Sequence, residues 1–377
     1  MNKRNVYIIT ANDYLIYQPT ILNLYDELEQ FFHVTIISFE PNFISKKKDE
    51  HRRTDYIQIP FLLRFVVQNF DYAIQLFFRL LKRVGLNFVH KHSFYHKLQV
   101  AYLKSKVKTL KADITIAVDV AALYICQQYF SDIQFLSLEI YEGDPLMKKV
   151  KVEEIGSVFI QNEPRFEFLF GKTPVRKFLI QNAPTFRESF ITQYERAGLV
   201  WAGSIVRRFA VLDCINFIRE HPEYNLTLKG GAEPKTLKHI GQNYHDLIKS
   251  GQLKIDQGYL TTDEFIDYLS HFRIGFCFYS WELIESSINY QTAPSGKLFM
   301  CMAAGVPVVA SNIPGFQFIQ DYKAGVLIDD YRPETINQAI LTIESDYQNY
   351  RAACYRVARD FSFHESVQPY LRYLLTK

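Results

Sequence analysis

The chain has 377 residues, of which 48% are apolar and 22% are charged, as in an ordinary globular protein of about two domains. Its net charge of +3 is nearly neutral and gives no reason to expect nucleic-acid binding. The five cysteines are scattered and form no C-x-x-C pair, so we expect reduced thiols in a cytoplasmic protein and no disulfide framework.

The first half alternates apolar strand-like segments with helices. The chain enters its first strand without a signal-peptide pattern, and no run of about 18 apolar residues predicts a transmembrane helix. The predicted strands are Asn5–Thr10, His33–Phe39, Tyr56–Pro60, Asp113–Ala117, Ile133–Leu138, Ser157–Ile160 and Arg176–Ile180. The main predicted helices are Gln18–Phe31, Val66–Val84 and Phe88–Leu110. Short apolar runs without polar alternation are typical of parallel strands covered on both faces, so we predict a doubly wound α/β domain.

A polar loop over residues 183–196 separates this half from a second series of the same kind. Its predicted strands are Gly198–Ala202, Asn225–Lys229, Leu253–Asp256, Ile274–Tyr279, Val306–Ala310 and Gly325–Ile328. Twelve of the 16 glycines lie from Gly198 onward, and glycine at a strand end lets the backbone approach a ligand closely. We therefore predict two tandem Rossmann-like domains, with the main ligand-binding loops in the second.

The first βα turn of each predicted domain can be tested for a phosphate site. The turn after Thr10 has no G-x-G-x-x-G, which argues against a dinucleotide cofactor. The turn after Ala202 contains Gly203, Ser204, Arg207 and Arg208, residue types that suit a diphosphate. The alternative is an ordinary surface turn with solvated arginines.

A second candidate anion site precedes the strand at Val306–Ala310. Ser295 and Gly296 begin a predicted helix that Gly305 ends. The free N–H groups and dipole of a helix N-terminus attract phosphate. Lys297 in the first turn opposes that dipole, so we predict that it serves the negative charge of a ligand.

Four segments of the second half resemble the donor domain of GT-B glycosyltransferases of the retaining group-1 (family 4-like) class. They are WAGSI (201–205), LTLKGG (226–231), GYLTTDEFIDYLS (258–270) and PSGKLFMCMAAGVPVVAS (294–311). In the first half, ADITIAVDVAALYICQ and FLSLEIYE are similar to the family's strand ends that face the acceptor. The resemblance implies two Rossmann-like domains facing a cleft. We expect an acceptor domain over residues 1–187, a nucleotide-sugar donor domain over 188–360, and a C-terminal helix over 361–377 that packs back on the first domain.

The resemblance also implies an activity, the transfer of a sugar from a nucleotide-diphosphate sugar to a hydroxyl acceptor. Neither a metal nor a cofactor beyond the donor is expected. The diphosphate is expected to contact the helix start and the βα turn, the base to lie against the 259–260 loop, and Gly230 to border the cleft. The residues implied for the donor are Gly203, Ser204, Arg207, Arg208, Gly230, Tyr259, Leu260, Ser295, Gly296, Lys297 and Met300.

Met300 departs from the family pattern. It stands where the family has a glutamate that binds the ribose hydroxyls, and a thioether cannot accept those hydrogen bonds in the same way. A catalytically weakened GT-B protein that binds or regulates a partner is therefore an alternative function. A sugar-nucleotide epimerase is a third reading, weakened by the lack of an obvious cluster of carboxylates and histidines in the first domain.

Two acidic residues of the first domain follow predicted strands. Asp119 ends one strand and Glu139 follows another, where each could bind an acceptor hydroxyl or act as a base. Helix capping is the alternative for Asp119. His90, His92 and His96 have no third ligand at a recognised spacing, so we interpret them as a solvated helix face and not as a metal site.

Residues 51–110 carry 11 Lys or Arg and two acidic residues, interleaved with aromatic and leucine side chains. The pattern fits a helical pair with a basic outer face, or a surface that binds an anionic membrane. The second reading suits a lipid-linked acceptor in polysaccharide or glycolipid synthesis. We expect a cytoplasmic protein that is peripheral on the inner face of the membrane.

Overall fold

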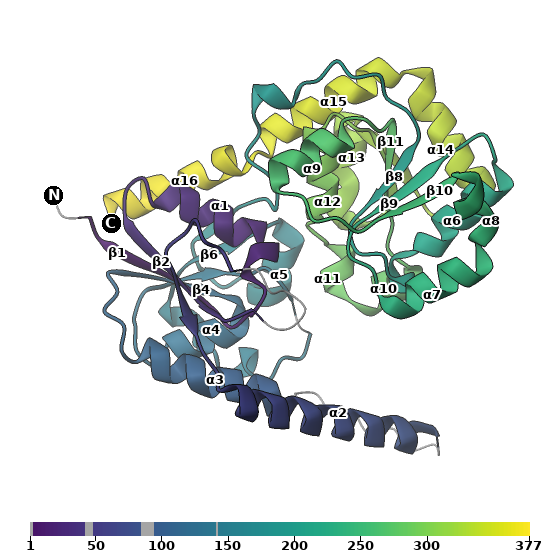
Figure 1. Ribbon diagram of the computed structural model, residues 1–377. Coiled ribbons are helices and arrows are strands. Elements are labelled where there is room, and N and C mark those ends of the chain that lie inside the picture. The colour runs from purple at the N-terminus through teal and green to yellow at the C-terminus, as the bar shows by residue number, and fades with distance from the viewer. Residues whose placement is uncertain (1–2, 42–47, 84–93, 141) are drawn as a thin grey trace. The chain divides into compact units, whose positions relative to one another are not determined.

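The computed structural model describes residues 3–41, 48–83, 94–140 and 142–377 (Figure 1). The chain forms two compact units. Unit 1 comprises residues 1–160 and 169–178, and unit 2 comprises residues 161–168 and 179–377. The chain passes from unit 1 to unit 2 for the last time after residue 178, nine residues before the predicted division at residue 187. Within the described ranges, no helix is long and apolar enough to cross a bilayer.

Unit 1 is built on a seven-stranded sheet in the order β3-β2-β1-β4-β5-β6-β7. The strands are β1 (Asn5–Thr10), β2 (His33–Phe39), β3 (Thr54–Ile57), β4 (Ile114–Val118), β5 (Ile133–Leu136), β6 (Ile155–Ile160) and β7 (Lys177–Leu179). The helices are α1 (Pro19–Leu28), α2 (Phe61–Arg83), α3 (Phe94–Val107) and α4 (Asp119–Cys126). Helix α5 (Glu163–Phe170) is divided between the units, with residues 163–168 in unit 2. The pairs from β3 through β6 are parallel, as the unbroken apolar runs predict.

Unit 2 contains a six-stranded parallel sheet in the order β10-β9-β8-β11-β12-β13. The strands are β8 (Leu199–Ala202), β9 (Leu226–Lys229), β10 (Leu253–Asp256), β11 (Ile274–Cys277), β12 (Val308–Ser311) and β13 (Gly325–Ile328). The helices are α6 (Val211–Glu220), α7 (Pro234–Asn243), α8 (His245–Ser250), α9 (Thr262–Leu269), α10 (Trp281–Ser286), α11 (Ile288–Gln291), α12 (Gly296–Ala303), α13 (Gln317–Tyr322), α14 (Pro333–Ser345), α15 (Tyr347–Asp360) and α16 (Phe363–Thr376). This strand order is that of a Rossmann fold, so the predicted fold class is confirmed.

Each predicted strand range overlaps an observed strand, and two of the shifted strand ends lie near prolines. β3 ends at Ile57, before Pro60, whose carbonyl accepts from the Arg64 amide at the start of α2. β12 begins at Val308, after Pro307. Proline has no N–H to donate to a sheet, so both strands stop short of it. The first part of the predicted helix Phe88–Leu110 lies outside the described residues, as do His90 and His92.

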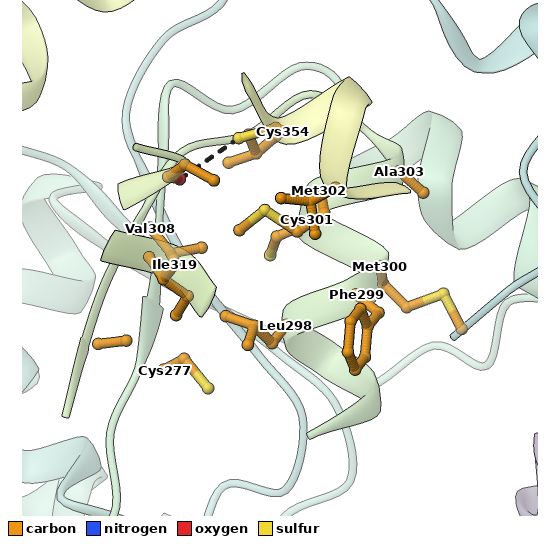
Figure 2. Close-up of a cluster of buried hydrophobic side chains, with 14 of the residues drawn as sticks. Cys277, Leu298, Phe299, Met300, Cys301, Met302, Ala303, Val308, Ile319 and Cys354 are labelled. Atoms are coloured by element: carbon orange, nitrogen blue, oxygen red, sulfur yellow. Dashed lines mark hydrogen bonds between the residues drawn. The ribbon is translucent and has the colours of Figure 1, made fainter. Parts of the chain in front are cut away.

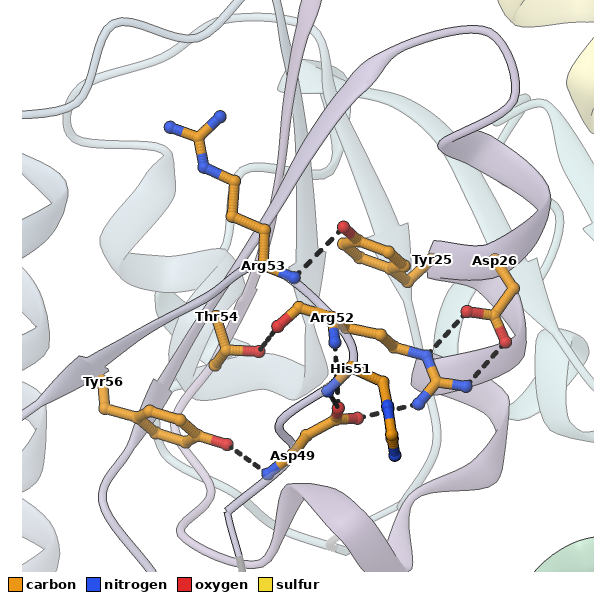
Figure 3. A network of polar contacts seen from close by, with 8 residues as sticks. All are labelled: Tyr25, Asp26, Asp49, His51, Arg52, Arg53, Thr54 and Tyr56. Atoms are coloured by element: carbon orange, nitrogen blue, oxygen red, sulfur yellow. Dashed lines mark hydrogen bonds and ion pairs between the residues drawn. The ribbon is translucent and has the colours of Figure 1, made fainter.

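A bidentate ion pair ties the segment before β3 to α1 (Figure 3). Arg52 donates from Nε and Nη2 to the two carboxylate oxygens of Asp26, at 2.7 and 2.6 Å, and from Nη1 to Asp49 at 2.8 Å. These hydrogen bonds outweigh partial burial and raise the pKa of Arg52 above its ordinary value. The Tyr25 hydroxyl accepts from the Arg53 amide and completes the connection.

The core of unit 2 gathers around α12, whose residues Leu298–Ala303 are all buried (Figure 2). Gly305 ends this helix in the left-handed region, at φ +64°, as predicted. Arg196 donates to the carbonyls of Ala304 and Gly305, both at 2.7 Å, and so places a cation at the negative end of the helix dipole. The C-terminal end of α12 is therefore fixed by hydrogen bonds as well as by packing.

Replacing Gly305 with alanine tests this end of the helix. A Cβ at Gly305 would lie 2.3 Å from Cζ of Tyr355, so we expect Gly305→Ala to lower the free energy of unfolding by about 2–4 kcal/mol, from overpacking added to left-handed strain. Gly251→Ala is the matched control, because Gly251 also has positive φ but an added Cβ there meets nothing within 4 Å. It should cost about 1 kcal/mol. Tryptophan fluorescence during urea unfolding reports on this unit, which contains both tryptophans, Trp201 and Trp281. Equal costs would contradict the packing argument.

Candidate functional site

The strand order of unit 2 places a ligand crevice at one point of the sheet. β8 pairs with both β9 and β11, so the chain winds outward in opposite directions from β8 and β11. In open α/β sheets, ligands bind outside the carboxyl ends of the strands at such a switch point. The segments that leave this point begin at Gly203, after β8, and at Phe278, after β11.

Two glycine backbones touch at the end of β8. Gly203 and Gly230 have φ of +135° and +145°, and the Gly203 amide donates to the Lys229 carbonyl at 2.8 Å. A Cβ at Gly230 would lie 2.1 Å from the Gly203 carbonyl oxygen. A Cβ at Gly203 would lie 3.1 Å from Cδ of Lys297. The predicted residues Gly203, Gly230 and Lys297 are thus brought together, and no larger side chain fits at either glycine without a shift.

The Lys297 ammonium lies among aromatic rings at the switch point. Nζ is 4.4, 4.9 and 5.3 Å from the ring centroids of Trp201, Tyr279 and Phe209. Across the described ranges, this ammonium has no ion pair and no hydrogen-bond partner. Burial lowers the pKa of Lys297 below its ordinary value. A cation held by rings alone is only partly compensated, and an anion would complete its coordination.

The N-terminus of α12 also offers donors at this place. Its cap residue Ser295 makes no side-chain cap hydrogen bond, and the amides of Gly296 and Lys297 have no acceptor among the described residues. Two asparagines fix the loop before the helix: Asn162 donates to the Thr292 carbonyl at 2.9 Å, and Asn182 to the Pro294 carbonyl at 3.1 Å. The helix start therefore presents N–H groups on a held loop.

The predicted arginines lie in a 3-10 turn over Arg207–Phe209. Both guanidinium side chains are exposed, as is Ser204, and neither arginine has an acidic partner in the described part of the chain. Arg208 lies over the Phe209 ring, with Cζ 5.2 Å from its centroid, and its carbonyl accepts from the Ser280 amide. Phe209 is thus shared by Arg208 and Lys297, whereas no described contact joins Arg207 to them.

An ion pair between a buried lysine and a partly exposed aspartate supports the loop that carries Tyr259 and Leu260. Lys229, with a side chain only 4% exposed, donates to Oδ1 of Asp256 at 2.8 Å, and the same oxygen accepts from the Gly258 amide at 3.0 Å. The hydrogen bond from Lys229 holds the pKa of Asp256 below its usual range. The Tyr259 side chain is 51% exposed, so the loop presents it to solvent or a ligand.

Met300 is a core residue. Its side chain is 9% exposed and belongs to the apolar cluster around α12, and Figure 2 shows it on the side of the helix away from Cys277 and Val308. In the position of the family glutamate, this chain therefore has an apolar side chain packed in the protein interior.

The two acidic candidates of unit 1 meet at the carboxyl ends of β4 and β5. Oδ1 of Asp119 accepts from the amides of Leu138 and Glu139, at 2.8 and 3.0 Å. Asp119 is not the cap of α4, as the alternative had it, because Val118 holds that position and Asp119 is the first helical residue, at φ +60°. Burial raises the pKa of the nearby Tyr14 to about 12, assisted by the charges of Asp119 and Glu139. Asp119 therefore fixes the segment that carries the exposed Glu139.

Sequence reasoning missed the neutral residues of the site. The aromatic residues around Lys297 lie in apolar segments and have the pattern of core residues. Asn162 and Asn182 act through the loop before α12, which is distant in the sequence. The only signal among these five was that Trp201 falls inside the segment WAGSI, which carries part of the resemblance.

Two Rossmann-like units with these loops define the GT-B class of fold. The family described as "Glycosyl transferases group 1" matches residues 301–361, from α12 through α15. No curated protein matches the chain. The family match confirms the resemblance of this part of the second unit to the group 1 glycosyltransferases.

Solved structures of the same fold cover the whole chain. HepE of Anabaena in complex with UDP is 11% identical over 99% of this chain and 100% of that chain, with a TM-score of 0.68. The α,α-trehalose 6-phosphate synthase of Burkholderia multivorans is 9% identical over 100% and 99%, with a TM-score of 0.66. A TarM variant of S. aureus with UDP is 11% identical over 98% and 99%, with a TM-score of 0.65. These structures confirm the GT-B fold of the chain.

Two lysine substitutions separate ligand binding from stability. Lys297 is a poorly compensated internal charge, so we expect Lys297→Met to leave the free energy of unfolding unchanged or higher. Lys229→Met should lower it by about 1–2 kcal/mol, because the partly exposed Asp256 loses its partner. Urea unfolding followed by tryptophan fluorescence measures both. A clear destabilisation by Lys297→Met would show that this lysine serves the fold.

Proposed function

We propose that the protein transfers a hexose from a nucleotide-diphosphate sugar to a hydroxyl acceptor, with retention at the anomeric carbon. The observation that carries the proposal is the Lys297 ammonium, which lies beside the start of α12 at the switch point with aromatic neighbours and no described anionic partner. A diphosphate is the anion that fits both a cation and a row of free backbone N–H groups.

In the proposed reaction, the bond between the anomeric carbon and the diphosphate oxygen breaks, and the acceptor hydroxyl oxygen bonds to that carbon. Negative charge develops on the departing diphosphate. The amides of Gly296 and Lys297, together with the Lys297 ammonium, would stabilise this charge in surroundings with little water, where electrostatic interactions are strong. Arg207 and Arg208 would close on the same group from their exposed turn, because an unpaired guanidinium can reorient toward phosphate.

The rest of the donor would lie along neighbouring loops. We assign the base to the loop of Tyr259 and Leu260, which the Lys229–Asp256 pair supports. Gly203, Ser204 and Gly230 would border the diphosphate and ribose. The two glycines have no Cβ, so a ligand can approach their backbone closely. Met300 would contribute only apolar packing behind the ribose.

The acceptor is assigned to unit 1. Glu139 is exposed and is held by backbone hydrogen bonds to Asp119, so it can accept from an acceptor hydroxyl and take up the proton that the hydroxyl loses. Two proteins of the same fold support the two-substrate assignment: HepE was solved with UDP and glucose, and TarM with UDP and α-GlcNAc-glycerol. We propose a lipid-linked acceptor in polysaccharide or glycolipid synthesis, used at the inner face of the membrane.

Met300 favours one alternative, a GT-B protein that binds a nucleotide sugar but transfers slowly. Thermal shift with UDP-, GDP-, ADP- and TDP-sugars, followed by turnover assays on those that bind, decides between the two. Binding with sugar transfer or donor hydrolysis is expected. Binding without turnover would favour the alternative, and absence of nucleotide binding would contradict both.

The pH dependence of nucleotide-diphosphate binding tests Lys297. Below its lowered pKa the lysine is protonated and attracts the diphosphate, and above that pKa it is neutral. Affinity should therefore fall as the pH rises, and the fall should occur at lower pH than for an ordinary lysine, whose pKa is about 10.4. Lys297→Met should weaken binding at pH 7 by about 10- to 100-fold and remove this dependence. Calorimetric titration measures both, and an unchanged profile in the variant would remove Lys297 from the site.

Met300→Leu tests whether the thioether has a specific role at the ribose. Leucine is of similar volume and apolar, so we expect nucleotide affinity to change by less than about twofold and stability by less than about 1.5 kcal/mol. The same calorimetric and unfolding measurements apply. A tenfold or greater loss of affinity at preserved stability would show that the sulfur itself contacts the donor.

A further inference from the structure

Helix α2 exposes an unusual number of large apolar side chains. Nine of its residues belong to this class, with exposed fractions from 38% to 75%. They are Phe61, Leu62, Leu63, Phe65, Val66, Phe70, Tyr72, Leu76 and Phe77. No other helix in the described part of the chain exposes as many. Figure 1 shows α2 projecting beyond the other elements of unit 1.

Helix α2 packs on unit 1 mainly along a narrow stripe, and Phe70 outside the stripe also packs edge-on against Phe94 of α3. Through residue 77, the residues that are buried or half-buried are Arg64, Val67, Asp71 and Ile74. Their spacing of three or four residues places them along one side of the helix. Val66 and Leu62, which are 60% and 75% exposed, lie on a different side. The large apolar face of α2 is therefore not the face that packs on unit 1.

The position of α2 is fixed by its single acidic residue. Asp71 is 7% exposed, and its two carboxylate oxygens accept from the amides of Phe94 and Tyr95, at 2.7 and 2.8 Å. The Asp71 charge is thus used at the N-terminus of α3. It does not oppose an anionic partner at the exposed face.

The charge around α2 is strongly basic. Residues 51–110 carry 11 Lys or Arg and two acidic residues. Arg52 and Lys106 are paired with carboxylates, but Lys97, Lys104 and Lys108 are exposed and have no acidic partner among the described residues. A second copy of the chain would bring two such basic regions together, which is unfavourable. An anionic lipid surface satisfies both the apolar face and the positive charge.

We propose that α2 lies in the plane of an anionic membrane and inserts its apolar face, centred on Leu62 and Val66, at the boundary between headgroups and acyl chains. Aromatic and leucine side chains would enter the apolar layer, while neighbouring lysines remain with the lipid phosphates. This inference deepens the proposed function, because it names the surface on which a lipid-linked acceptor would be met. Its test measures membrane binding and not transfer, so the two can fail separately.

Site-specific fluorescence on the full chain provides the test. All five cysteines are buried, so a cysteine introduced on α2 can be labelled selectively with an environment-sensitive dye such as NBD. Val66→Cys places the dye on the apolar face, and Gln68→Cys is the matched control on an exposed polar position two residues away. With vesicles containing about 30% anionic lipid, we expect a blue shift and a rise in emission for Val66→Cys only. Vesicles of zwitterionic lipid alone, or high salt, should weaken the response.

Co-sedimentation with the same vesicles supplies a second measurement. Leu62→Gln combined with Leu76→Gln should lower the membrane partition coefficient by about tenfold. Leu341→Gln, at an apolar position of α14 that is 49% exposed, should leave it unchanged. Lys297→Met should also leave it unchanged, and the α2 double variant should retain nucleotide binding.

Three outcomes would overturn the proposal. One is no response of the Val66→Cys dye to anionic vesicles at low salt, and another is an equal response at position 68. The third is a blue shift without vesicles that grows with protein concentration, which would assign the apolar face to a second copy of the chain.

Discussion

The rest of unit 2 depends on how one ammonium group is accommodated at the switch point of the sheet. Lys297 lies in a first helical turn, where the helix dipole disfavours a cation, and no described carboxylate compensates it. Aromatic rings from β8, from the segment after β11 and from the 207–209 turn surround it. Such an arrangement costs stability in the free protein, and it is favourable once an anion arrives. The geometry is that of a binding site maintained at some expense to the fold.

The two ends of α12 differ in how they are bonded to the rest of the unit. The C-terminal end is closed by Arg196, by the left-handed Gly305 and by the Tyr355 ring above it. The N-terminal end is held through the loop that Asn162 and Asn182 fix, and the amides of Gly296 and Lys297 have no acceptor among the described residues. Between the ends, every side chain from Leu298 to Ala303 is buried. A rigid apolar helix with one open end can present donors without moving when charge develops on a ligand.

The local sequence predicts the strands and several glycines of the site, because both depend on residues that are close together in the chain. Unbroken apolar runs indicated parallel strands, and each predicted range overlaps a strand. Gly203, Gly230 and Lys297 were predicted as site residues from separate motifs, and the sheet order brings them together. The helix-cap interpretation of Asp119 was wrong, since its carboxylate reaches amides that lie about 20 residues further along the chain.

By itself, the sequence determined the two α/β halves, the helix start at Ser295 and the departure at Met300, since each depends on residues adjacent in the chain. Only the tertiary structure decided that Trp201, Phe209 and Tyr279 surround Lys297, because aromatic residues in apolar runs have the same pattern in a core as around a cation. It also decided that α2 packs mainly along a narrow stripe and leaves most of its apolar residues exposed. Periodicity shows that a helix has an apolar face, but packing determines which face the protein covers.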